Sequence, residues 1–406
     1  MKLLYYEDPA GNFGDDLNPW LWPRLAPDLL DGDGQTLFVG IGSILDERIP
    51  AVPLKVVFGT GIGYGRLPSI DESWKIYCVR GPLTAQALGL PADLALTDPA
   101  ALVSAVVRPD VPKLHAVSLM PHFRTSGRAK GQGVDLETVC NDLGVNYINP
   151  SGGVEATIFG LQSSNLVIAE AMHGAIVADA LRVPWVPVQI YDQISSLKWW
   201  DWCKSLGLEY VPTVYSAAQA DPASELAGFM RSVMAHARPV LSNEAGSAAA
   251  IERLEEKLDR LRRDRGGGGF TGSTKLVQDP EVLRGIPWLY DIQSAIREIV
   301  TVIPVGESFI LVDDMQWGGG RIVAGRTAIP FTEREGQYWG PPSDSATAIR
   351  ELERLRQSGA GFIVFAWSSF WWLDYYAEFN DYLRSVYKCI LETDQLVMFS
   401  ISSQAS

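Results

Sequence analysis

The sequence predicts an α/β fold in which short buried strands alternate with helices. The clearest unit lies within residues 165–188. Residues 166–169 form an apolar run typical of a strand buried on both faces, residues 175–181 place apolar side chains on one helical face, and residues 185–190 are apolar again. Two strands joined by a helix within about 25 residues run parallel. The same alternation recurs after a glycine run at 266–269, which predicts a separate C-terminal domain.

The N-terminal elements show the same pattern and define a first half, residues 1–108. Each expected strand is a short apolar run that ends in glycine or a polar turn, and Pro82 suits the first turn of a helix that ends near Leu88. A proline-rich stretch that begins at Arg108 looks like the hinge to the next half. The expected strands are 2–6, 36–39, 55–58 and 75–79, and the first helix ends near residue 25.

Residues 109–240 are predicted as a second half, which contains the 165–188 unit. Strands are expected at 115–119 and 145–148, and a helix that begins near residue 226 closes this half. Three tryptophans crowd the stretch 198–202. They suit the packing of a crossover helix onto the sheet, and the alternative is a stacking surface for a sugar ring.

Residues 241–272 are expected to form an amphipathic helix followed by a glycine-rich linker. Ile251, Leu254, Leu258 and Leu261 keep a coiled-coil spacing over only two heptads, so the helix would either dock onto the chain or support a homo-oligomer.

Residues 273–406 are predicted as a smaller α/β domain. Its expected strands are 308–312, 361–365 and 397–401, with a helix over 346–357. Its aromatic stretches, 338–342 and 367–376, suit a compact core, and the alternative is an exposed surface for a glycan or a partner.

Composition excludes several classes of protein. The 406 residues are 47% hydrophobic and 20% charged, as in an ordinary globular protein, and the formal net charge of −14 argues against a general nucleic-acid binder. The four cysteines have no CxxC spacing, and no histidine cluster or paired acidic motif predicts a metal site. The start lacks a signal peptide and no apolar run is long enough to predict a transmembrane segment, so we expect a cytoplasmic protein.

His173 and Gly174 lie where ligands usually bind in an open α/β sheet. They fall between a strand and the start of its helix, and Glu170 stands at the end of that strand. Two interpretations fit His173: an acid–base group, or a buried side chain bonded to a neighbouring carbonyl.

Other expected strands are also followed by charged residues. Arg80 follows one strand, and His122 and Arg124 follow another, where either an anion or solvent would surround them. Asn12 and Asp15 open the first helix, so they suit contact with a ligand as well as an ordinary turn or cap.

Two glycine-containing loops are further candidates for binding. The loop 59–65 has the spacing GxGxGxG, which fails the dinucleotide fingerprint, so Gly61 and Gly63 are interpreted as letting the backbone approach a ligand. Ser151, Gly152 and Gly153 precede a helix, where they either cap it or leave N–H groups for an anion.

Taken together, these motifs resemble the polysaccharide pyruvyl transferase family over residues 1–215, with most similarity to the branch of succinoglycan-type exopolysaccharide synthesis. The resemblance depends on Asn12-Phe13-Gly14-Asp15, Gly59-Thr60-Gly61, Arg80, Thr97-Asp98-Pro99-Ala100, residues 150–165 and Glu170-Ala171-Met172-His173-Gly174-Ala175. Many members carry Arg-Leu before the histidine, where this chain has Ala171-Met172. The C-terminal domain resembles accessory domains appended to bacterial glycosyltransferases.

The resemblance implies two facing Rossmann-like halves, as in GT-B enzymes, and a pyruvate ketal transferred from phosphoenolpyruvate to a sugar. No cofactor is expected, and the acceptor would be a glycan or a lipid-linked saccharide. His173 would be the acid–base group, and Glu170 would orient it or act as a second base. Arg80 and Arg124 would hold phosphate and carboxylate, while Asn12, Asp15 and the loop 59–65 would face the acceptor.

Two alternatives stay open at this stage. One is a GT-B-type glycosyltransferase that uses a nucleotide sugar, because the same architecture serves both reactions. The other is a non-catalytic scaffold in glycan assembly that would act through its aromatic C-terminal domain and its amphipathic helix.

Overall fold

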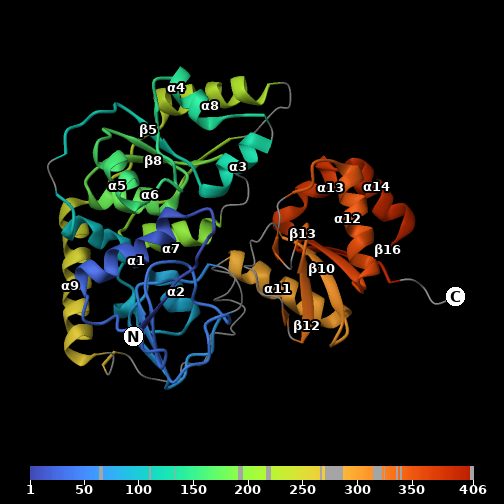
Figure 1. The fold of residues 1–406 in the computed structure, drawn as a ribbon, viewed down its shortest axis with the longest axis horizontal. Helices are drawn as coiled ribbons and strands as arrows, with labels where there is room; N and C mark the ends of the chain where they lie inside the picture. The colour runs from blue at the N-terminus through green and yellow to red at the C-terminus, as the bar shows by residue number, and fades with distance from the viewer. Residues whose placement is uncertain are drawn as a thin grey trace. The chain divides into compact units, whose positions relative to one another are not determined.

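The structure is a computed structural model that describes residues 1–63, 67–108, 111–131, 133–190, 195–215, 221–265, 268–269, 287–313, 322–323, 325–334, 337–338 and 341–402. The described residues up to 269 form one compact unit, and those from 287 onward form a second unit. Figure 1 shows the mixed α/β character of both units, which confirms the α/β part of the predicted fold class. Among the described residues, no helix combines the length and the apolar character needed to cross a bilayer.

The first unit begins with a parallel four-stranded sheet in the order β1-β2-β3-β4. Its strands are β1 (Lys2–Leu4), β2 (Thr36–Val39), β3 (Leu54–Phe58) and β4 (Trp74–Cys78). Its helices are α1 (Phe13–Leu25), α2 (Pro82–Ala87), and the 3-10 helices η1 (Ala92–Leu94) and η2 (Pro99–Ala105). The β2 bounds agree with the prediction, whereas β1 ends two residues before the predicted end.

A second parallel sheet in the same unit has five strands in the order β6-β5-β7-β8-β9. The strands are β5 (Ser118–Met120), β6 (Asn146–Tyr147), β7 (Val167–Ala169), β8 (Trp185–Gln189) and β9 (Thr213–Val214). The helices are α3 (Phe123–Gly131), α4 (Leu136–Asp142), α5 (Val154–Gln162), α6 (Met172–Ala180), α7 (Ser196–Ser205) and α8 (Pro222–His236). Strand β7, helix α6 and strand β8 form the predicted parallel β-α-β unit.

One hydrophobic core joins the two sheets. Trp22 and Phe58 from the first sheet's side belong to the same buried cluster as Trp185 and Trp199 from the second. Helix α1 also packs against both α5 and α6. The tryptophans of α7 are therefore mainly structural, as the packing interpretation predicted.

Helix α9 (Glu244–Asp264) runs along one side of this unit (Figure 1). It packs against η2 and β4. Leu254, Leu258 and Leu261 are buried in the shared core, so the apolar side of this helix docks onto its own chain. Docking is thus the alternative that the structure shows.

The second unit contains a six-stranded sheet in the order β11-β12-β10-β15-β17-β16. Its strands are β10 (Ser308–Val312), β11 (Ile322–Val323), β12 (Arg326–Pro330), β15 (Phe362–Ala366), β16 (Lys388–Glu392) and β17 (Leu396–Ser400), with a hairpin of β13 (Glu333–Arg334) and β14 (Gln337–Tyr338). Strand β10 pairs in parallel with both β12 and β15, whereas the pairs β11–β12, β15–β17 and β16–β17 are antiparallel. The helices are α11 (Pro287–Val302), α12 (Ser345–Gln357), η3 (Trp367–Ser369), α13 (Trp371–Tyr375) and α14 (Ala377–Val386).

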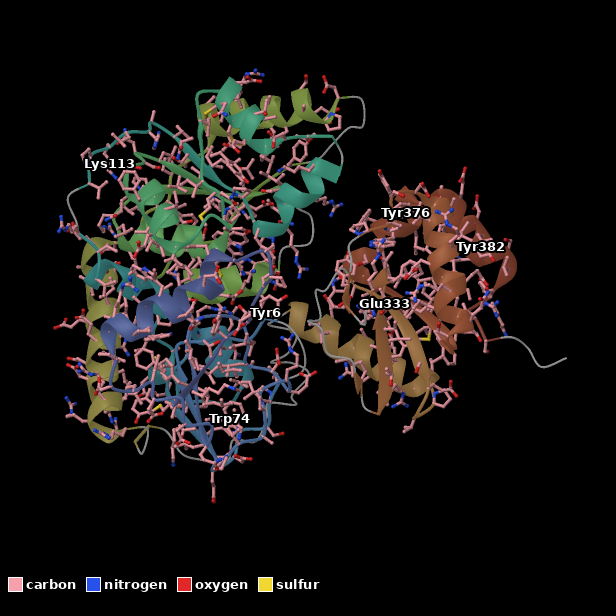
Figure 2. The ribbon with its side chains drawn as sticks, in the orientation of Figure 1. Tyr6, Trp74, Lys113, Glu333, Tyr376 and Tyr382 are labelled. Carbon is pink, nitrogen blue, oxygen red and sulfur yellow. The ribbon has the colours of Figure 1, made fainter. Side chains whose placement is uncertain are left out.

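The aromatic stretch 367–376 mainly forms core. Trp372 and Tyr376 are buried in the cluster that contains Phe379, and the Tyr376 hydroxyl, labelled in Figure 2, donates to the Pro342 carbonyl at 2.7 Å. Tyr375 is exposed. Within the aromatic stretch 338–342, residues 339 and 340 lie outside the described residues, as do 64–65 of the predicted glycine loop and 266–267 of the glycine run.

Candidate functional site

Ionisable side chains from both sheets meet at the carboxyl ends of their strands. Tyr6 follows β1, His122 and Arg124 follow β5, and His173 follows β7. Figure 2 labels Tyr6 near the border between the blue first half and the green second half. Burial and the charge of Asp8 raise the pKa of the Tyr6 hydroxyl, while the charge of Arg124 and a hydrogen bond with it lower that pKa. Arg124 and Tyr6 therefore link the two halves at this border.

His173 lies in the first turn of α6 with its ring packed against α1. A Cβ added to Gly14 would lie 2.0 Å from His173 Nδ1 and 2.7 Å from Cγ, so only glycine fits beside this ring. The His173 side chain is 15% exposed. A partly exposed imidazole beside a sheet's carboxyl edge can exchange protons with a ligand.

The other ring nitrogen of His173 faces a buried carboxylate. His173 Nε2 lies 3.5 Å from Asp98 Oδ2, and Asp98 Oδ1 accepts the backbone N–H of Ala100 at 2.9 Å, which caps η2. The 3.5 Å contact is longer than an ordinary hydrogen bond. The contact places a buried carboxylate directly beside the ring, where it can orient the imidazole.

Sequence reasoning did not assign a site role to Asp98. The signal was present, because Asp98 belongs to the Thr97-Asp98-Pro99-Ala100 motif. Its neighbour Pro99 occupies the first turn of η2, and η2 packs against α6. This packing brings Asp98 to His173, which lies 75 positions later in the sequence.

Asp15 lies on the first turn of α1, one residue after the glycine that contacts His173. Burial raises the pKa of its carboxyl to about 6, against the opposing effects of His173, Lys198 and a hydrogen bond from Asn12. Asn12 Nδ2 is the donor of that bond. Of the predicted site residues, Asn12, Asp15 and His173 are therefore brought together.

Lys198 and Arg124 make the second half's part of the site basic. Burial is the largest cause that holds the pKa of His122 well below its usual range, and the positive charges of Lys198 and Arg124 lower this pKa further. His122 is therefore neutral at pH 7, and the surrounding positive charge favours an anion. Sequence reasoning missed Lys198, because it lies on α7 and not directly after a strand.

Glu170 fixes the loop that carries His122 and Arg124. Its fully buried carboxylate accepts the backbone N–H of His122 at 2.9 Å, the Thr125 hydroxyl at 2.6 Å and the backbone N–H of Ile190 at 2.7 Å. These bonds join the ends of β5 and β8. This arrangement differs from the expected position beside the imidazole and gives Glu170 a role in positioning the loop.

Arg80 is buried in a structural network, in contrast to the expected anion-binding position. Its Nε donates to Asp201 Oδ2 at 3.1 Å, Nη1 to Ser43 Oγ at 2.6 Å and Nη2 to the Ile62 carbonyl at 2.6 Å. The other Asp201 oxygen accepts the backbone N–H groups of Leu83 and Thr84, at the start of α2. The side chain is fully buried, so this pair joins the two halves and is not exposed to a substrate.

Gly61 and Gly63 leave no room for a side chain, because other parts of the protein occupy that space. A Cβ at Gly61 would lie 2.5 Å from Arg80 Cζ, and one at Gly63 would lie 2.5 Å from Ser43 Cβ. Both glycines are buried. The close approach predicted for this loop occurs, but the approaching groups are Arg80 and Ser43.

Ser151, Gly152 and Gly153 form an exposed loop beside the start of α1. The Ser151 hydroxyl donates to the Gly11 carbonyl at 2.7 Å, and the backbone N–H of Phe13 donates to the Pro150 carbonyl at 2.9 Å. Gly153 has a φ of 91° before α5, and no side chain caps that helix. The loop therefore lies next to Asn12, at the edge of the candidate site.

Comparison with known proteins identifies a curated relative. The chain is 40% identical over 221 residues to "Succinoglycan biosynthesis protein ExoV" of Rhizobium meliloti (strain 1021), which covers 52% of this chain and 67% of the relative. The chain belongs to the ExoV family. The name of this relative supports exopolysaccharide biosynthesis as the setting of the ExoV family. No family profile matches the chain, and no solved structure matches it.

Proposed function

We propose that this ExoV-family chain is a pyruvyl transferase that moves a pyruvate ketal from phosphoenolpyruvate to a sugar of a bacterial exopolysaccharide or its lipid-linked precursor. The observation that carries the proposal is the grouping of His173, its partner Asp98 and the cations Arg124 and Lys198. It combines a proton-transfer group with positive charge suited to a polyanionic substrate. The relative's role in succinoglycan biosynthesis supports a glycan acceptor.

Ketal formation determines which protons the site must deliver and accept. One proton adds to the methylene carbon of phosphoenolpyruvate and produces an oxocarbenium-like centre at the neighbouring carbon. Two sugar hydroxyls attack this centre in turn, each losing a proton, and the C–O bond to phosphate breaks. One hydroxyl proton thus replaces the proton delivered to carbon, and the other leaves with phosphate.

His173 delivers the proton to carbon in this proposal. Asp98 stabilises the charged imidazolium and holds the ring in position, as a carboxylate does beside other catalytic histidines. Gly14 supplies the contact that fixes the opposite side of the ring.

Arg124 and Lys198 bind the anionic groups of phosphoenolpyruvate. A planar guanidinium suits bidentate contact with a carboxylate or phosphate, and the ammonium adds a compact charge. Glu170 positions the loop before α3 for this purpose. From the sequence, Arg80 and Arg124 were both expected to bind the anionic groups, and in this proposal Arg124 has that role.

The proposal keeps the arrangement implied by the family resemblance. Residues 1–108 and 109–240 act as two GT-B-like halves in a cytoplasmic enzyme, with the acceptor sugar on the first half. Asn12 and the Ser151–Gly153 loop then lie on the acceptor's side. Residues 241–272 join these halves to the accessory domain, residues 273–406.

Phosphate release from phosphoenolpyruvate, measured across a panel of glycosides and lipid-linked saccharides, tests the proposed function. His173→Ala and Arg124→Ala are each expected to lower the rate, the former by about 10²–10⁴-fold. His236→Ala and Arg231→Ala are matched controls, because both residues are exposed on α8.

Thermal stability measurements separate the alternatives. Phosphoenolpyruvate should raise the melting temperature of the wild-type protein through preferential binding to the folded state. Stabilisation by UDP- or GDP-sugars instead would favour a glycosyltransferase. Absence of phosphate release across the whole acceptor panel would contradict the proposed activity.

A further inference from the structure

We infer that Asp15 is a second catalytic residue, which accepts the proton of an attacking hydroxyl of the acceptor sugar. The inference rests on the proposed function and deepens it. It assigns the two proton-transfer tasks to side chains from different halves: His173 from the second sheet's side and Asp15 from the first.

The position of Asp15 carries the inference. The preceding residue, Gly14, is in direct contact with the His173 ring, so the first turn of α1 holds Asp15 close to the imidazole. Asn12 Nδ2 donates to Asp15 Oδ2, and Asp15 Oδ1 lies 3.5 Å from the position of a Cβ at Gly42. Asp15 is therefore held between α1 and the loop after β2.

The ionisable groups around Asp15 come from three helices and from the segment after β1. His173 on α6 and Lys198 on α7 favour its ionised form, whereas Asp16 on α1 opposes ionisation. Tyr6, which follows β1, also interacts electrostatically with Asp15. Burial outweighs these influences and raises the pKa of Asp15 to about 6, which suits a base that works near neutral pH.

Asp16 shows that this environment is specific to one carboxyl of the helix. The Asp16 carboxylate accepts the backbone N–H of Asn12 at 3.0 Å, as an ordinary residue does at the start of a helix. Neither His173 nor Lys198 is among the groups that shift its pKa. Asp16 is therefore the matched control for Asp15.

His173 and Asp15 together account for every proton that moves in the reaction, so no external co-reactant is needed. Protonated His173 gives its proton to the methylene carbon and recovers one from the first hydroxyl, as that oxygen bonds to the new electrophilic carbon. Ionised Asp15 takes the proton of the second hydroxyl, which forms the second C–O bond after the bond to phosphate has broken. Asp15 then returns this proton to the departing phosphate, and both side chains regain their starting states.

Steady-state kinetics between pH 5 and pH 9 test the inference in the full-length chain. Asp15→Asn should lower kcat by about 10²–10⁴-fold, with a smaller effect on the KM for phosphoenolpyruvate, and should abolish the loss of activity below about pH 6. Asp16→Asn should retain the wild-type rate and an acid limb, which should lie slightly lower in pH because the charge of Asp16 no longer opposes the ionisation of Asp15. Circular dichroism and thermal melts establish that each variant is folded.

The wild-type protein supplies a second measurement that needs no variant. Ionisation of a carboxyl creates charge, whereas ionisation of an imidazolium moves existing charge, so an organic cosolvent raises the apparent pKa only of the carboxyl. The acid limb of the wild-type profile should shift upward in cosolvent.

An active wild-type enzyme whose rate and acid limb survive Asp15→Asn would overturn the inference and leave the proposed function intact. An acid limb that does not respond to cosolvent would also overturn it. If no acceptor supports phosphate release by the wild-type protein, the proposed function fails first and the inference fails with it.

Discussion

Replacement of Gly14 by alanine is a direct test of how α1 positions His173. The added Cβ would lie 2.0 Å from Nδ1, 2.7 Å from Cγ and 2.8 Å from Cε1 of the ring. These atoms belong to a rigid ring and not to the end of a flexible chain. Ordinary contact begins near 3.4 Å, so the imidazole or the helix must move by about 1.4 Å.

The size of this displacement gives the expected loss of activity. A misplacement of about 1 Å costs roughly 10²-fold in rate, so Gly14→Ala should lower kcat by about 10²-fold or more. Its effect on stability should be smaller. Overpacking costs about 1–3 kcal/mol, and the better helix propensity of alanine offsets roughly 1 kcal/mol of that cost.

Gly228→Ala is the matched control, because Gly228 lies within α8 and a Cβ there would meet nothing within 4 Å. This variant should keep wild-type kcat and gain about 0.5–1 kcal/mol in the free energy of unfolding. Phosphate release and urea unfolding of the three proteins provide the comparison. Wild-type activity in Gly14→Ala would show that the packing of the ring against α1 does not matter for the reaction.

Three further predictions concern buried carboxylates. Asp98→Asn should lower the rate of phosphate release by at least about 10-fold, but by less than the roughly 10²–10⁴-fold loss expected for His173→Ala. An unchanged rate would show that Asp98 has no role in the site. In a urea titration, Asp201→Ala should lower the free energy of unfolding by about 3–5 kcal/mol, because it leaves the Arg80 charge buried without its carboxylate. The control Glu155→Ala breaks the exposed pair with Arg24 and should lower the free energy of unfolding by less than about 1 kcal/mol. Since the folded-state pKa of Asp15 is raised from 3.8 to about 6, its favourable contribution to stability is complete below about pH 4 and is lost as the pH rises through 6. Asp15→Asn should therefore increase the free energy of unfolding by up to about 3 kcal/mol at pH 7.5 and change it little at pH 4, and an equal effect at both values would contradict the raised pKa.

Strand positions could be predicted where the local pattern is sufficient. β2 and β10 have the predicted bounds because each is an apolar run flanked by turn residues. Helix α6 begins three residues earlier than predicted, and no side chain caps its start, so the sequence carried no capping signal there. Helix α11 was not predicted, although Ile292, Ala295 and Ile299 have helical spacing and are buried.

The site could be predicted only where it depends on residues that are close together in the sequence. Position after a strand correctly brought His122, Arg124 and His173 to one edge of the second sheet. The same rule failed to describe Arg80, because its partner Asp201 lies 121 positions later in the sequence and arrives through the packing of α7. Burial of an arginine depends on such distant partners, and a single sequence does not display them.

The contacts explain why motifs far apart in this chain form one site. Gly14 lacks a Cβ because the His173 ring occupies that space, and the same helical turn places Asp15 next to that ring. Pro99 begins the 3-10 helix that holds Asp98 on the ring's other side. A change in any of these three motifs therefore alters the environment of one imidazole. Gly14 and Asp98 contact the same ring, so the effects of Gly14→Ala and Asp98→Asn on the activation free energy from kcat should not be additive in the double variant. Additive effects would show that the two residues act independently.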